Sequence, residues 1–269
     1  MRPNSFLTLK PSKWGPLLLR FVASWWYMVH LGAIALVMAF SPSTYNRENR
    51  IATSRHIYTS TWQVLPWFTL LAALVSLVLI RIVVVTALSY GLSQYALEMV
   101  VRVLVLELIP LTAAMFVALR AGLSFNAGDA RAVQAAEDGT PARAAQAQNR
   151  LRRELVPQVI GNAFAVLSLA MVSSVIVLVL AYVSVYGGSP WGLPDYTRTV
   201  GRVFNLAVTL GFILKTVFFG LAVAVIPTAA LLEVQRYGRH SSSTVQPGAI
   251  RLLFVLLVIE AASLAVKYI

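Results

Sequence analysis

The sequence predicts an all-α, polytopic membrane protein with five transmembrane helices and an N-terminal interfacial (elbow) helix. Of its 269 residues, 58% are hydrophobic and only 12% are charged, and the mean hydropathy is +0.75. Soluble domains carry about 25% charged residues, so these values exclude a disordered chain and disfavour a water-soluble enzyme. The chain has no cysteine, and its three histidines share no metal-ligand spacing, so we predict neither a disulfide nor a metal site.

Five stretches are long and apolar enough to cross a bilayer core of about 30 Å, which takes roughly 20 helical residues. They are residues 64–89, 100–124, 155–186, 203–232 and 250–269. A sixth stretch, 17–40, carries Trp25, Trp26 and Tyr27 near its start and is flanked by basic residues on both sides. Because basic flanks favour the cytoplasm, we interpret it as an amphipathic or re-entrant helix in the inner leaflet; a signal peptide is the alternative.

The net charge of +12 is distributed unevenly along the chain. Fifteen of the 22 lysines and arginines fall in residues 1–63, 125–154 and 233–249, counting Arg251 at the edge of the last span. Only three fall in the segments on the other side of the membrane, which are 90–99, 187–202 and the C-terminus. Cytoplasmic loops are enriched in basic residues, so both the N-terminal region 1–63 and the loop 125–154 are predicted to be cytoplasmic. The C-terminus of the five-span bundle, 64–269, then lies on the outer side of the membrane, and the whole chain forms a single membrane domain. The basic excess indicates this topology rather than binding to nucleic acid.

The loop 125–154 is predicted to form a short helical hairpin. Asp129 can cap an Ala-rich helix that ends at Gly139, and Thr140 and Pro141 suit the N-cap and first position of a second helix. Two interpretations stay open: a docking element for a cytoplasmic partner, or a solvated connector anchored at the headgroups. The charged residues of interest are Asp129, Arg131, Glu137, Asp138, Arg143, Arg150, Arg152 and Arg153. On the other side, the Gly- and Pro-rich segment 187–202 is predicted to be an ordered turn region.

Charged residues inside the spans are the candidate functional residues, because burying a charge in a bilayer is costly. Glu107, Lys215 and Glu260 lie deepest, and Pro110 is expected to kink the helix that carries Glu107. Either these residues form a structural ion pair between spans, or they line a route for lipid headgroups; a Glu–Lys pair would satisfy both. The remaining cations can snorkel to the headgroups: Arg81, Arg102 and Arg120.

Motifs for soluble chemistry are absent from the sequence. It contains no G-x-x-x-x-G-K-[ST] phosphate loop, no H-E-x-x-H and no G-x-S-x-G. Neither ATP binding nor hydrolase chemistry is therefore predicted for this chain.

Five segments resemble, in order and spacing, the MlaE/YrbE-type permeases, the membrane subunits of ABC transporters that move phospholipids or related lipids with MCE proteins. The segments are "LPWFTLLAAL", "LELIPLTAAMFVALRAG", "LVPQVIGNAFAVLSL", "ILKTVFFGLAVAVI" and "RLLFVLLVIEAASLAV". The resemblance places five residues on charged or proline positions of the family and marks them as candidates for the substrate path: Glu107, Pro110, Arg120, Lys215 and Glu260. The chain departs from the family pattern at Leu106, at Ile109 and in the loop 125–154, which lacks the signature of the family's coupling helix.

The resemblance implies a transport subunit, rather than an enzyme, in the bacterial inner membrane. It implies a second permease copy (homodimer or heterodimer), a cytoplasmic ABC ATPase that binds ATP and Mg²⁺, and a periplasmic MCE-domain protein. The loop 125–154 would couple to the ATPase, and lipid would enter between the permeases. The rival hypotheses are a non-transporting scaffold or assembly subunit, and an intramembrane enzyme that uses Glu107 or Glu260.

Overall fold

The computed structural model describes residues 25, 26, 30, 33, 47–121, 141–237 and 248–268. These residues are helical apart from short turns, and no strand occurs among them. Five helical stretches are long and apolar enough to cross a membrane: Thr53–Ser89, Ser93–Ala121, Pro157–Tyr186, Leu206–Pro227 and Ala249–Val266. The prediction of an all-α, five-span protein is confirmed. Of the predicted interfacial helix 17–40, four residues are described and all are helical; the rest of it lies outside the described residues.

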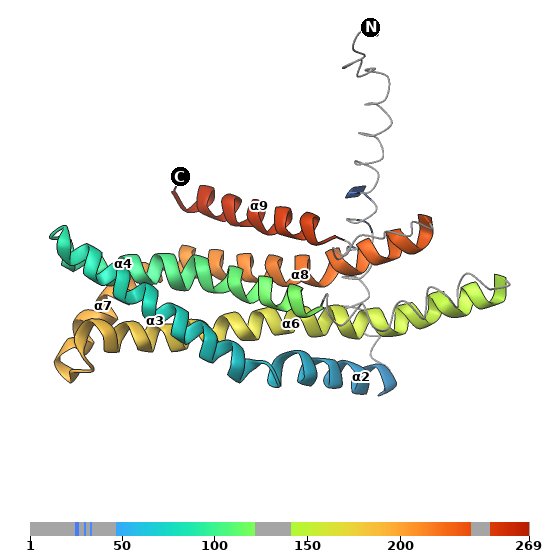
Figure 1. Ribbon diagram of the computed structural model, residues 1–269, viewed down its shortest axis with the longest axis horizontal. Coiled ribbons are helices and arrows are strands. Elements are labelled where there is room, and N and C mark those ends of the chain that lie inside the picture. Colours follow the sequence, from blue (N-terminus) through green and yellow to red (C-terminus); the bar gives the residue numbers. More distant parts are fainter. Residues whose placement is uncertain are drawn as a thin grey trace, which may run out of the picture.

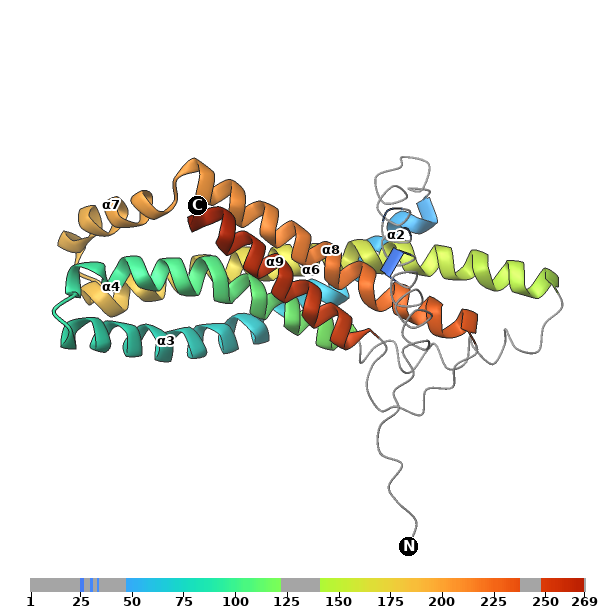
Figure 2. The ribbon, with the colours of Figure 1, turned by 90° about the horizontal axis from the view of Figure 1, so that it is seen from above.

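The first two spans form an antiparallel pair. Helix α2 (Arg47–Ile57) continues through the π-helix η3 (Tyr58–Trp62) towards α3 (Leu65–Ser89), which ends at a turn with a positive φ at Gly91. The chain returns through α4 (Ser93–Val100), the π-helix η4 (Val101–Leu108) and a helix over 109–121, and α3 and α4 lie side by side (Figures 1 and 2).

The second span starts earlier than the sequence predicts. Residues 90–99 are expected to be a connecting segment, but the structure is helical from Ser93 onward. The apolar side chains of Ala96, Leu97 and Val100 share one face of α4, and that face is buried against the bundle. Packing of this face stabilises helix in a segment whose mixed polarity resembles that of a loop.

The third span belongs to one continuous helix of 46 residues, α6 (Pro141–Tyr186). As expected, a helix begins at Pro141, but the prediction that it is a separate short element before residue 155 is wrong. Residues 141–160 are dominated by Ala, Gln, Arg and Leu, which are strong helix formers, and no glycine interrupts them. The N-terminal part of α6 therefore projects beyond the bundle (Figure 1), and Pro157 is accommodated inside the helix.

The predicted turn region 187–202 contains a second unexpected helix. Gly187 and Gly188 have positive φ values and make the turn, and a 3₁₀ turn η5 (Pro190–Gly192) leads into α7 (Leu193–Val203). The phenol of Tyr196 donates a hydrogen bond to the carbonyl of Leu178 at 2.9 Å, which fixes α7 against α6. Burial raises the pKa of the Tyr196 phenol above its usual value. Most of the glycines and prolines of this connection thus lie before α7, and the helix itself contains Pro194 in its first turn and Gly201 near its end.

Helices α8 (Leu206–Tyr237) and α9 (Ala249–Tyr268) complete the bundle, with α9 packed on α8 (Figure 2). The apolar interior consists of two clusters of buried side chains, one around Phe68, Leu169 and Phe219 and the other around Ile80, Val101 and Phe212. The two clusters follow one another along α8, because Phe212 and Phe219 lie two turns apart on that helix.

Gly220 marks a close approach of α8 to α6. A Cβ atom at this position would lie 3.1 Å from the carbonyl oxygen of Ala163, whereas a Cβ at Gly211 on the same helix would meet nothing within 4 Å. Small residues at such points let the backbones of membrane helices approach.

We expect Gly220→Ala to be less stable than Gly211→Ala by about 1–3 kcal/mol. Both changes give α8 the same gain in helix propensity, and only the first pushes a methyl group against rigid backbone. Thermal unfolding of the two variants in the same detergent measures the difference. Equal unfolding midpoints would show that α6 and α8 can move apart to accommodate the added methyl group without a loss of stability.

Candidate functional site

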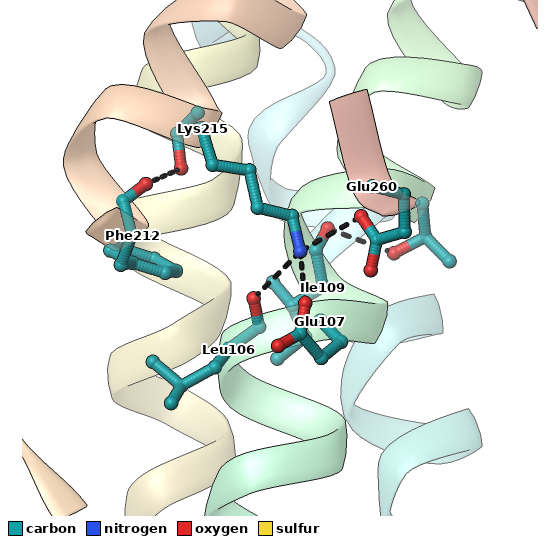
Figure 3. A network of polar contacts seen from close by, with 8 residues as sticks. Leu106, Glu107, Ile109, Phe212, Lys215 and Glu260 are labelled. Atoms are coloured by element: carbon teal, nitrogen blue, oxygen red, sulfur yellow. Dashed lines mark hydrogen bonds and ion pairs between the residues drawn. The ribbon is translucent and has the colours of Figure 1, made fainter. Parts of the chain in front are cut away.

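Three charged side chains from three different spans meet inside the bundle (Figure 3). Glu107 comes from η4, Lys215 from α8 and Glu260 from α9. The ammonium nitrogen Nζ of Lys215 forms an ion pair with Glu107 and lies 2.8 Å from Oε2 of Glu260. Only 2% of the Lys215 side chain is exposed, against 17% for Glu107 and 14% for Glu260. We call Glu107, Lys215 and Glu260 the ion cluster.

The backbone next to Glu107 supplies a further acceptor to the ion cluster. Pro110 has no N–H group, so it cannot donate to the carbonyl of Leu106 four residues earlier, as a helical residue would. Nζ of Lys215 donates a hydrogen bond to this carbonyl at 3.2 Å. The segment also has π-helical geometry from Val101 to Leu108, a feature that occurs often at functional sites. The proline thus leaves an acceptor for the lysine within a stretch that is helical from Ser93 to Ala121.

Aromatic side chains surround the lysine on α8. The ring centroid of Phe219 lies 5.7 Å from Nζ of Lys215, within range of a cation–π interaction. Phe212 lies on the other side along the helix, and its carbonyl accepts a hydrogen bond of 2.7 Å from the hydroxyl of Thr216. Because both phenylalanines are buried, water is largely excluded from the lysine, and its charge depends on the carboxyl groups for compensation.

A cavity of about 230 Å³ adjoins the ion cluster. It lies between η4, the first turns of α8 and the last turns of α9, at the predicted outer end of those two helices. Besides Glu107 and Lys215, its polar lining comes from Asn205 and Ser263. Its other lining residues are Leu106, Ala207, Val208, Gly211, Phe212 and Val266. The cavity gives a small polar group access to charges that are otherwise enclosed.

A second cavity of about 340 Å³ lies at the opposite end of α9 and is lined only by apolar residues. Its walls are the helix 109–121 and the beginning of α9. The lining residues are Met115, Phe116, Ala118, Leu119, Ala249, Leu252, Leu253 and Leu256. One polar and one apolar cavity therefore flank α9.

The structure keeps the three arginines of the spans away from the ion cluster. A guanidinium nitrogen of Arg120 donates to the carbonyl of Thr59 in η3 at 2.8 Å, which ties the second span to the first. Arg102 pairs with Glu98 one turn earlier, also at 2.8 Å. Arg81 is exposed on α3, as snorkelling requires.

The structure describes four of the eight predicted coupling residues. Arg143, Arg150, Arg152 and Arg153 lie on the part of α6 that precedes the candidate span Pro157–Tyr186. The other four lie outside the described residues: Asp129, Arg131, Glu137 and Asp138. Their role in coupling stays a prediction.

Sequence reasoning did not identify the Leu106 carbonyl, Asn205 or Ser263 as parts of the site. The first could have been found, because the residue four positions before a helical proline always loses a backbone donor. Asn205 accepts a hydrogen bond from the backbone N–H of Val208 and so caps α8. Helix capping alone explains an asparagine at this position, so the sequence gives no reason to assign it to the site. Nothing in the sequence distinguishes Ser263 from other small polar residues in a span.

The fold and the site together define a multi-pass membrane protein with a charged site enclosed among its spans. A family model described as "Permease MlaE" matches residues 53–266. The chain therefore belongs to the MlaE permease family, whose role is that of the permease in an ABC transporter, and by this membership it is a transport subunit. Searches of curated proteins and of solved structures gave no match.

Proposed function

We propose that this chain moves phospholipid, or a related lipid, between the inner membrane and a periplasmic MCE-domain protein. A partner ABC ATPase, which binds ATP and Mg²⁺, would power the transport, and a second permease copy would complete the membrane part. The N-terminus would be cytoplasmic and the C-terminus periplasmic. The observation that carries the proposal is membership of the permease family together with an ion cluster that faces a cavity inside the spans.

The two cavities beside α9 support an amphiphilic substrate. The cavity next to Glu107 and Lys215 offers charged and hydrogen-bonding groups, as a lipid headgroup requires, and the second cavity offers only apolar walls. A lipid combines both kinds of surface in one molecule, whereas an ion or a sugar would have no use for the apolar cavity.

The decisive experiment combines purification with lipid transfer. We expect the chain, purified in mild detergent from its native membrane, to retain an ATPase with a phosphate-binding loop and an MCE-domain protein. Reconstituted in vesicles with these partners, it should transfer fluorescent phospholipid when ATP and Mg²⁺ are supplied. Recovery of neither partner, or ATP hydrolysis without any transfer, would favour a non-transporting scaffold.

A further inference from the structure

The ion cluster contains more carboxyl groups than cations. With both glutamates ionised and Lys215 protonated, its formal charge would be −1. The other residues that line the adjoining cavity are uncharged. An uncompensated charge in the middle of a membrane domain is costly, so the cluster needs one more positive charge.

The arrangement around Lys215 indicates what supplies this charge. Carboxyl oxygens of Glu107 and Glu260 both lie against Nζ of Lys215, so the two carboxyl groups are brought together on one ammonium group. Two carboxylates that share one buried site do not readily both ionise, because their like charges repel. Lys215 cannot supply a second positive charge, because its single ammonium group already serves both glutamates and the carbonyl of Leu106.

We propose that Glu107 and Glu260 form a proton-binding site and share one proton, which makes the ion cluster electrically neutral. The proton comes from water and reaches the site through the cavity at Asn205 and Ser263, on the side where α8 begins and α9 ends. Two interacting carboxyl groups titrate as a pair, so the proton belongs to both.

The shared proton also stabilises the attachment of α9. This helix is the least buried of the five candidate spans, with 11% of its apolar window buried. The ion pair between Glu260 and Lys215 holds it to the bundle. When alkaline pH removes the proton, the two glutamates repel each other and this attachment weakens. Stability is therefore present while the proton is bound and falls as the pH rises through its release.

Infrared spectroscopy of the purified chain in lipid nanodiscs tests the site directly. We expect wild type at neutral pH to show the C=O stretching band of a protonated carboxyl, which shifts in heavy water and disappears on alkaline titration. Glu107→Gln and Glu260→Gln should each lack the band, because either change leaves one carboxylate for one lysine. The matched control is Glu98→Gln, which should keep the band, because Glu98 pairs with Arg102 and lies outside the ion cluster.

Thermal unfolding gives a second, independent measurement. Raising the pH should lower the unfolding midpoint of wild type more than that of Glu260→Gln, which has no shared proton to lose. Absence of the band in wild type at neutral pH, or its persistence in both glutamine variants, would overturn the proposal. Neither result depends on lipid transport. The proton site can therefore be confirmed if the proposed function is wrong, and it can be refuted if the proposed function is right.

Discussion

Replacing Lys215 with alanine is expected to destabilise the folded protein by about 3–5 kcal/mol, the cost of breaking a buried ion pair by removing one partner. The change leaves Glu107 and Glu260 without their cation and the Leu106 carbonyl without its donor. We expect a low yield in membranes and a lower midpoint in thermal unfolding in detergent. Lipid transfer should fall with the amount of folded protein.

Two further variants test whether the destabilisation comes from leaving buried charges uncompensated. Arg81→Ala removes a cation that is exposed on α3, and its effect should stay within about 0.5 kcal/mol. Combining Lys215→Met with Glu107→Gln and Glu260→Gln removes all three charges and should recover most of the lost stability, because neutral replacements of buried ion pairs are often tolerated. Normal expression and normal lipid flux in Lys215→Ala would refute a structural ion cluster.

Reversing the charge of Arg150, Arg152 and Arg153 to glutamate is expected to weaken the association with the ATPase by at least about tenfold, equivalent to roughly 1.4 kcal/mol. These arginines lie on α6 immediately before the span, beside the segment proposed to contact the ATPase. Opposing charges at an interface both steer association and stabilise the complex, so three reversals act in the same direction. Quantitative co-purification with a tagged ATPase gives the measurement.

The control for the triple variant uses arginines at the other end of the bundle. Arg198 and Arg202 are exposed on α7, and their reversal changes the net charge in the same direction without touching α6. This double variant should retain the ATPase fully. Undiminished recovery of the ATPase with the triple variant would exclude this part of α6 as its docking element.

The spans were predictable from sequence because they depend on length and local hydrophobicity. The predicted spans 64–89 and 250–269 differ from α3 and α9 by at most one residue at each end. The start of the third helix was misjudged because hydrophobicity ends at the membrane, whereas helix formation in 141–156 depends on backbone propensity and continues into water. The helix α7 was missed because glycines and prolines are dense in 187–194 and Gly201 lies within the helix, although Pro194 falls in its first turn, where proline is tolerated.

The ion cluster was only partly predictable. The cost of charge in a bilayer selected Glu107, Lys215 and Glu260 and suggested a Glu–Lys pair. Their meeting is set by how η4, α8 and α9 pack, and Lys215 is 108 residues away from Glu107 in the sequence. The same limitation explains Arg120, whose contact with Thr59 depends on how the π-helix η3 presents its carbonyl.

The order in which the ion cluster is assembled has a consequence for biogenesis. The ribosome delivers Glu107 with the second span, Lys215 with the fourth and Glu260 only with the last helix. Until α8 is inserted, Glu107 is a lone acid in lipid, and until α9 follows, the cluster is incomplete. A chain that terminates before residue 249 thus lacks Glu260 and retains only the pair of Glu107 with Lys215. The last helix to be synthesised therefore sets the net charge of the finished cluster.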